Sequence, residues 1–199
     1  MTTTMRPQGR HEDVVPDGTL VADETRARRW SRYIAAAVRV SLGWVFLWAF
    51  LDKAFAIGRA TGLDPETGAV DYFGNAAWIK GGSPTAGFLG FGVKGPLADF
   101  YSSLAGNVIV DWLFMLGLLG IGLALILGIG MRIAAVAGAA MLLMMWSAVL
   151  PPENNPFIDD HIVYALVLVL LALIGAGRTF GLGKRWEQIP FVQKHGWLT

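Results

Sequence analysis

The sequence predicts an all-α membrane protein, in which four transmembrane helices form an antiparallel bundle with a long glycine-rich extracytoplasmic loop. Apolar residues make up 54% of the 199 residues and charged residues only 16%, against about 25% charged in an average soluble domain. The mean hydropathy is +0.51, and a soluble fold of this length could not bury so much apolar surface. The apolar residues also gather in four long runs, which charged or glycine- and proline-rich segments separate.

Residues 1–32 are polar and carry charges of both signs. We expect them to form a basic cytoplasmic tail that is largely disordered, until about Thr25. The first span follows at about 33–57. With a rise of about 1.5 Å per residue it is longer than the roughly 30 Å of the hydrocarbon core, so it is expected to cross the membrane.

The outer loop 58–107 does not have the pattern of a spanning segment, because charges interrupt it and glycines are frequent between Gly81 and Gly95. Pro96 is well placed to begin a short helix. Apolar residues recur at helical spacing just after it. We expect this amphipathic helix to lie on the membrane surface or on the bundle.

Three further apolar runs are the remaining expected spans, at about 108–130, 133–151 and 161–178. Arg132 marks a tight turn between the second and third spans, which makes them antiparallel neighbours. Small residues four positions apart, such as Ala134 and Gly138, favour close helix packing. The transmembrane domain is therefore 33–181, and a basic amphipathic cytoplasmic tail, 182–199, follows it.

Basic residues predict how the four spans are oriented. The N-terminal tail, the turn at Arg132 and the C-terminal segment contain eleven Lys and Arg, whereas the opposite loops and helix ends contain four. Basic residues accumulate on the cytoplasmic side of membrane proteins. The sequence thus predicts a multi-pass protein of the cytoplasmic membrane, of the bacterial inner-membrane type, with both termini in the cytoplasm.

The ionisable residues of the spans indicate a functional site. Such groups cost roughly 2.5–3.5 kcal/mol each at membrane depth on insertion scales. Apart from Arg39, they gather at the outer ends of three spans. Trp44 and Trp48 share one face of the first span with Asp52, because the three residues are four positions apart. The candidate pocket contains Lys53, Asp52, Asp111, Asp160, His161, Trp44, Trp48 and Trp146.

This pocket at the extracytoplasmic membrane boundary is suited to a quinone. The flat ring would stack on the tryptophans, the isoprenoid tail would lie in lipid, and the carbonyls would need hydrogen-bond donors and a proton source. His161 is the candidate donor, because its unperturbed pKa is about 6.5 and Asp160 or Asp111 could keep it protonated. His161 and Asp160 are therefore the candidate catalytic residues, and Lys53, Asp52, Asp111 and the tryptophans are the candidate cofactor-binding residues.

Structural explanations of the same residues remain open. Tryptophans also anchor helices at the membrane interface. The charges are equally consistent with solvated helix ends, or with an ion pair that joins Asp52 and Lys53 to Asp111 and locks the bundle. Arg39 either extends back to the cytoplasmic headgroups or has a buried partner.

Several cofactors are not expected. Cysteine is absent, which excludes disulfides, thiolate catalysis, zinc–thiolate sites and cysteine-ligated iron–sulfur clusters. A buried haem needs an axial ligand from within a span, and the methionines of apolar helices are usually gap fillers. No metal site is expected, because consecutive residues such as Asp159, Asp160 and His161 rarely point the same way on a helix.

Three motifs resemble the DoxX/DoxD family of four-helix integral membrane proteins. They are the run from Arg39 to Lys53, the glycine-rich run from Gly117 to Gly128 followed by Arg132, and the run from Asn155 to His161 with Tyr164 after it. The resemblance covers roughly residues 33–181. It implies association with the membrane part of thiosulfate:quinone oxidoreductase or with related oxidoreductase complexes, and it adds Tyr164 to the cofactor-binding candidates.

The leading functional hypothesis is the membrane subunit of a quinone-linked oxidoreductase, with sulfur-compound oxidation as one candidate reaction. The outward segments carry nine acidic against four basic residues, which opposes steering of an anion such as thiosulfate. Without cysteine or a second redox domain, a redox partner protein is expected; a homo-oligomer is compatible with the sequence, and no nucleic acid is expected. The alternative is a non-catalytic scaffold that docks a partner through its outer loop or cytoplasmic tails. A transporter is disfavoured by the few polar groups within the spans.

Overall fold

The computed structural model describes residues 18–64, 66–153 and 155–198, and within these ranges it is helical and contains no strand. The four longest helices are α1 (Gly18–Phe55), α3 (Val108–Leu127), α4 (Met131–Ala148) and α5 (Asp160–Leu173). The short helices are η1 (Trp78–Lys80), η2 (Phe88–Gly92), α2 (Ala98–Ser102), η3 (Ala176–Arg178), α6 (Gly183–Trp186), α7 (Pro190–Lys194) and η4 (Gly196–Leu198). The expectation of an all-helical protein is therefore confirmed for the described chain.

Three helices are long and apolar enough to cross a membrane by length and composition, namely α1 from Thr25 onward, α3 and α4. They correspond to the first three expected spans. The fourth expected span is α5, an apolar helix of only 14 residues. At about 1.5 Å per residue, α5 is roughly 21 Å long, which is less than the hydrocarbon thickness of about 30 Å.

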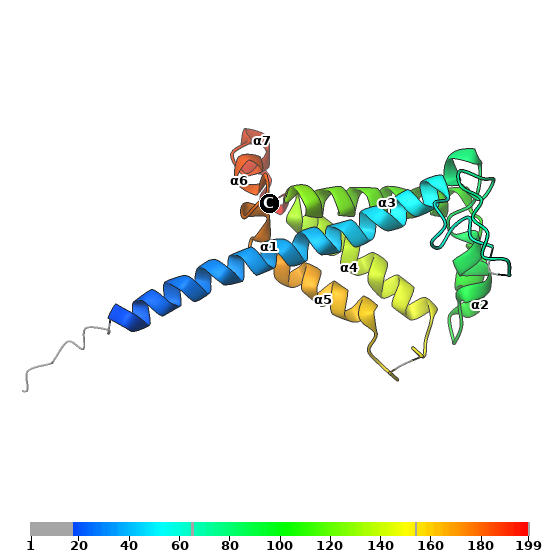
Figure 1. Ribbon diagram of the computed structural model, residues 1–199, viewed down its shortest axis with the longest axis horizontal. Coiled ribbons are helices and arrows are strands. Elements are labelled where there is room, and N and C mark those ends of the chain that lie inside the picture. The colour runs from blue at the N-terminus through cyan, green and yellow to red at the C-terminus, as the bar shows by residue number, and fades with distance from the viewer. Residues whose placement is uncertain (1–17, 65, 154, 199) are drawn as a thin grey trace, which may run out of the picture.

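The long helices pack in neighbouring pairs (Figure 1). Helix α1 lies along α3 and α4 lies along α5, while α3 contacts α4 and α1 contacts α5. Apolar side chains of all four helices meet in one core, which includes Phe46, Leu118, Leu142 and Leu168. Gly138 faces Leu168 of α5 as well as Ile121 of α3, so this glycine packs on both neighbours rather than only on the preceding span.

The helix ends follow local sequence signals. Asn107 accepts hydrogen bonds from the backbone N–H groups of Ile109 and Val110 and so caps the start of α3. Gly128 ends α3 with φ +72°, a left-handed conformation that glycine adopts without strain. Helix α1 begins at Gly18, well before the expected span, and its N-terminal part projects beyond the other helices (Figure 1). Residues 1–17 of the expected tail lie outside the described residues.

Arg39 has buried partners. Its guanidinium is fully buried and donates hydrogen bonds to four backbone carbonyls, which come from two distant segments. These are the carbonyls of Leu125, Ile126 (3.0 Å), Thr179 (3.2 Å) and Phe180 (2.9 Å). Carbonyls in the last turn of a helix have no partner within the helix. Arg39 therefore caps the end of α3 and attaches the segment after α5 to it, and its side chain does not extend to the headgroups.

Candidate functional site

A cavity of about 530 Å³ lies where α1 ends and α3 begins, beneath the loop that connects them. We call it the loop-end cavity. Its wall is mostly apolar, and among the described residues that line it Lys53 is the one that carries a charge. The polar side chains in its wall are Lys53, Thr61, Ser83, Thr85 and Tyr101, and the large apolar ones include Phe88, Phe114, Met141, Met144 and Met145.

Asp111 fixes the loop segment that covers this cavity, residues 83–89, which we call the roof. Its buried carboxylate accepts hydrogen bonds from the hydroxyls of Ser83 (2.9 Å) and Thr85 (2.5 Å) and from the backbone N–H of Thr85 (3.2 Å). The segment from Ser83 to Leu89 is thereby fixed to the first turn of α3. Asp111 is not among the residues that line the cavity, so within the described chain it anchors the wall rather than facing the space.

Asp52 has a similar anchoring position at the end of α1. It is buried, and its two oxygens accept hydrogen bonds from the backbone N–H groups of Arg59 (3.0 Å) and Ala60 (2.9 Å). These bonds fix the chain as it leaves the helix. In the described residues no ion pair joins Asp52 or Asp111 to Lys53. The ion pair that was one of the structural alternatives for these charges is therefore not seen there.

Of the predicted pocket residues, Lys53 lines the loop-end cavity, and the others are not among the described residues of its wall. Its Nζ lies 6.0 Å from the ring centroid of Phe114, within the range of a cation–π contact. Tyr101 lines the same cavity, and its hydroxyl shares a 2.6 Å hydrogen bond with the hydroxyl of Ser147. The cavity therefore combines one ammonium group and several hydroxyls with an apolar wall.

The structure places His161 and Asp160 elsewhere, at the start of α5. Nδ1 of His161 lies 2.8 Å from the carboxylate of Asp159 and 3.5 Å from that of Asp160. Asp159 also caps α5 by accepting from the backbone N–H groups of His161 and Ile162. Asp160 lines a second cavity of about 510 Å³, between residues 92–94 and 149–160. The two candidate catalytic residues are thus separated from the loop-end cavity.

The Asp159, Asp160 and His161 side chains are also the cluster that could hold a metal ion, since their ligand atoms lie within 4.8 Å of one another. Asp159 already accepts hydrogen bonds from two backbone N–H groups and is paired with the imidazole. The cap and the pair account for this arrangement without an ion. The expectation that these consecutive side chains point apart is wrong, because Asp159 is the extended N-cap residue that precedes the first turn of α5.

The aromatic candidates lie outside both cavity walls. Trp44 and Trp48 are 50% and 37% exposed, and their ring centroids are 5.8 Å apart on the outward face of α1. Trp146 donates a 3.1 Å hydrogen bond from its indole N–H to the carbonyl of Phe157. Tyr164 is also exposed. Within the described chain these residues do not form the floor of either cavity.

Sequence reasoning missed much of the cavity wall. Met141, Met144 and Met145 line it together, and their spacing on one helix face was the signal that could have identified them. Ser83 and Thr85 had no such signal, because they lie in an aperiodic, glycine-rich loop. Asp159 could have been recognised as a cap, since Asp directly before an apolar helix is a common N-cap.

The apolar helices and the exposed aromatic residues indicate a helical membrane protein that contacts the lipid bilayer. Comparison with protein-family models, with curated proteins and with solved structures finds no match to this chain.

Proposed function

We propose that this protein is the membrane subunit of a quinone-linked oxidoreductase, and that the loop-end cavity is its quinone site. The observation that carries the proposal is a largely apolar cavity of about 530 Å³ with one ammonium group, that of Lys53, in its wall. Ligand sites for small amphiphiles are typically apolar with a few placed polar groups. A bound quinone would supply a two-electron acceptor that diffuses in the membrane.

The residues of the cavity suit a quinone ring chemically. A carbonyl oxygen needs a hydrogen-bond donor, and Lys53 offers three N–H donors on a flexible stem. Ser83 and Thr85 also line the wall, but their hydroxyls already donate to Asp111. Phe88 and Phe114 provide apolar surface for the ring. Lys53 is accordingly the residue that would orient the head group, and Asp111 positions the roof above it.

The proposal includes a fourth span and a defined orientation. Helix α5 packs along α4, and its apolar sequence continues through Ala176 and Gly177 in η3. A short span can be accommodated by local thinning of the bilayer. With α5 in the membrane, the distribution of Lys and Arg supports a topology with both termini in the cytoplasm and the loop-end cavity at the outer boundary.

The DoxX/DoxD resemblance agrees with this proposal at one residue. Lys53 ends the first of the similar motifs and also lines the cavity. The third motif, from Asn155 to His161, borders the second cavity instead. His161 and Asp160 therefore stay candidate residues for proton exchange at the surface, without contact to the proposed quinone site. The reductant is not assigned, and sulfur compounds are one class to test.

The test is a binding titration of the full chain in a neutral detergent with a short-tailed ubiquinone or menaquinone analogue. Binding is detected by the quenching of tryptophan fluorescence. Lys53→Met removes the ammonium group and keeps the length of the side chain. We expect about tenfold weaker binding, since a hydrogen bond to a charged group contributes roughly 1.5–3 kcal/mol. Lys80→Met removes the same charge from an exposed residue of η1, outside the cavity wall. Equal affinities of wild type and both variants would contradict the proposal.

A scaffold function is the second candidate, and one observation favours it. The outer loop exposes several large apolar side chains, among them Phe91 (94%), Ile79 (59%) and Phe100 (59%). Where such side chains form one surface, that surface marks an interaction site for a partner protein or for lipid. In the scaffold case, the wild-type protein binds no quinone, and Phe91→Ser reduces the size of the complex seen by native electrophoresis of gently solubilised membranes. In the oxidoreductase case, quinone binds and Phe91→Ser leaves its affinity unchanged.

A further inference from the structure

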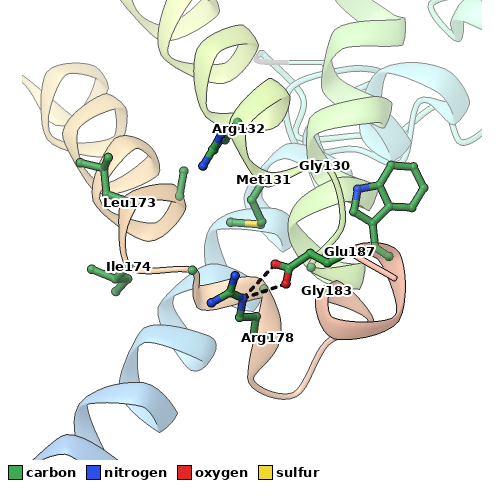
Figure 2. Close-up of a pocket in the computed structure, with 13 residues that line it drawn as sticks. Gly130, Met131, Arg132, Leu173, Ile174, Arg178, Gly183 and Glu187 are labelled. Carbon is green, nitrogen blue, oxygen red and sulfur yellow. Dashed lines mark hydrogen bonds and ion pairs between the residues drawn. The ribbon is translucent and has the colours of Figure 1, made fainter. Parts of the chain in front are cut away.

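A second site lies at the opposite end of the helices. A cavity of about 170 Å³, open on one side, is bounded by the turn between α3 and α4, the end of α5, and the segment from η3 to α6 (Figure 2). One water occupies about 30 Å³ in the liquid, so the space would hold a group of several heavy atoms. We call it the helix-end cavity.

Backbone packing makes this cavity rigid. A Cβ on Gly128 would lie 2.7 Å from the carbonyl oxygen of Gly177, and one on Gly183 would lie 2.7 Å from the same atom. The N–H of Leu182 donates a 2.7 Å hydrogen bond to the carbonyl of Leu127. The two chain segments therefore meet with almost no intervening side chain, and the wall is preformed.

The lining of the helix-end cavity is positively charged overall, with Arg132, Arg178 and one acid, Glu187. Arg132 and Arg178 lie on opposite sides of the space (Figure 2). Nε of Arg178 lies 2.9 and 3.0 Å from the two carboxylate oxygens of Glu187, and both contacts use one of the five N–H donors of a guanidinium. Arg132 uses Nη1 to donate to the carbonyl of Gly196 (2.6 Å). Each arginine thus keeps further donors for an anion.

Apolar surface continues directly from the cavity. Leu173, which lines it, is 80% exposed, and Ile174 beside it is also exposed. On the C-terminal segment the exposed rings of Phe180, Phe191 and Trp197 lie near the basic residues Lys184 and Lys194 in the sequence. Aromatic and basic residues together are typical of segments that lie in the headgroup region of a membrane.

We propose that the helix-end cavity binds the phosphate of an anionic glycerophospholipid, with Arg132 and Arg178 as its ligands and the acyl chains against the exposed end of α5. Arg and phosphate form strong charge-assisted hydrogen bonds. Basic pockets between membrane helices on the cytoplasmic side are suited to anionic headgroups. The site is independent of the loop-end cavity, and it would tie the C-terminal segment to the inner leaflet.

The test uses the full chain in a neutral detergent, titrated with short-chain phosphatidylglycerol and, separately, with phosphatidylcholine of the same chain length. Bound lipid is counted by native mass spectrometry. We expect phosphatidylglycerol to bind preferentially, and the double variant Arg132→Gln/Arg178→Gln to bind it about tenfold more weakly. The control, Arg29→Gln/Arg32→Gln, removes the same charge from exposed positions on α1 and should bind like wild type.

A further variant keeps the test decisive if the double variant is unstable. Glu187→Gln retains both arginines and removes the competing carboxylate, so it should bind phosphatidylglycerol more tightly than wild type. Equal binding of the two lipids would overturn the proposal, as would equal losses in the two double variants. Displacement of the lipid by inorganic phosphate at the same concentration would also overturn it, because the site would then select a free anion. Quinone binding at the loop-end cavity is measured separately, and its outcome leaves this test unaffected.

Discussion

The hydroxyl of Thr85 donates a 2.5 Å hydrogen bond to the buried carboxylate of Asp111. This contact connects the first turn of α3 to a loop that comes earlier in the sequence, and it closes one side of the loop-end cavity. A hydrogen bond to a charged group is roughly twice as strong as a neutral one. The shape of the cavity thus depends on a single carboxylate that does not itself face the ligand space.

Removal of this carboxylate should loosen the roof of the cavity. In Asp111→Ala, Ser83 and Thr85 lose their shared acceptor, and we expect the local opening free energy of residues 83–89 to fall by about 2–3 kcal/mol. Asp111→Asn keeps one acceptor oxygen, so the opening free energy of this segment should fall by less than in Asp111→Ala. Hydrogen exchange of this segment measures the effect, with Asp99→Ala, at an exposed position of α2, as the control. Unchanged exchange in Asp111→Ala would show that the roof is held by other contacts.

Arg39→Met should destabilise the whole helical domain. The variant leaves the carbonyls of Ile126 and Phe180 without their donor, and we expect the free energy of unfolding to fall by about 3 kcal/mol. Titration with a denaturing detergent, followed by circular dichroism, measures this quantity. Arg32→Met removes a charge from an exposed position of the same helix and should have little effect. A similar loss of unfolding free energy in both variants would mean that the positive charge, rather than the hydrogen bonds to the helix end, stabilises the fold.

Two glycines of α3 offer a matched test of helix packing. A Cβ on Gly122 would lie 2.8 Å from the backbone nitrogen of Leu47 in α1, whereas a Cβ on Gly120 meets no atom within 4 Å. We expect Gly122→Ala to cost about 2 kcal/mol, because backbone cannot move aside easily. Gly120→Ala should be neutral or stabilising by up to about 1 kcal/mol, because alanine favours helix. Equal stabilities in the same denaturation experiment would refute the described contact between α1 and α3.

The pair of Lys94 and Glu153 predicts a pH dependence at the second cavity. Lys94 donates a 2.9 Å hydrogen bond to Glu153, and this bond and the positive charge lower the pKa of Glu153. Because the folded pKa lies below the unfolded value of about 4.3, the pair stabilises the fold above that pH. Its contribution disappears as the pH falls through the folded pKa. The melting temperatures of wild type and Glu153→Gln should therefore differ slightly at pH 7 and converge at a pH below the folded pKa of Glu153.

The matched control for this pair is Glu66→Gln, at an exposed glutamate of the outer loop. Its melting temperature should equal that of wild type at both pH values. High salt should reduce the difference in melting temperature between wild type and Glu153→Gln, because the ion pair is exposed and dissolved ions screen its charges. A difference between wild type and Glu153→Gln that persists at low pH would contradict an electrostatic origin.

The sequence was sufficient to predict the long apolar helices. Long apolar runs predicted α1, α3 and α4, because each is uniform over many residues and is bounded by charges, glycine or proline. The clustering of Asp52 and Asp111 near one end of the helices was also predictable, since both lie where apolar runs meet a loop. Both carboxylates are buried there.

The partners of these charges were not predictable from pattern alone. Asp111 is bonded to Ser83 and Thr85 in a loop without periodicity, and Arg39 is bonded to carbonyls 87 and 141 positions away. Such contacts depend on how the chain returns, and backbone carbonyls carry no residue-specific signal. The predicted pocket is divided between two cavities for a similar reason. Residues at the same end of neighbouring helices can face different cavities, and the sequence pattern does not show which one they face.

The most direct test of the quinone site is to add a bulky side chain to a residue that lines the loop-end cavity, at a position where the added Cβ meets no other atom. Gly87 lines the cavity, has φ −66° and ψ −52°, and would accept a Cβ with no atom within 4 Å. Gly90, in the neighbouring η2 helix, has the same free space but does not line the cavity. Both positions therefore accept leucine without a direct clash at Cβ.

The deciding measurement is the affinity of a short-tailed quinone analogue for wild type, Gly87→Leu and Gly90→Leu in neutral detergent. We expect saturable binding to wild type and wild-type affinity in Gly90→Leu. Binding to Gly87→Leu should be at least about tenfold weaker, which corresponds to about 1.4 kcal/mol. Equal affinities in all three proteins, or no saturable binding to wild type, would contradict the assignment of this cavity as a quinone site.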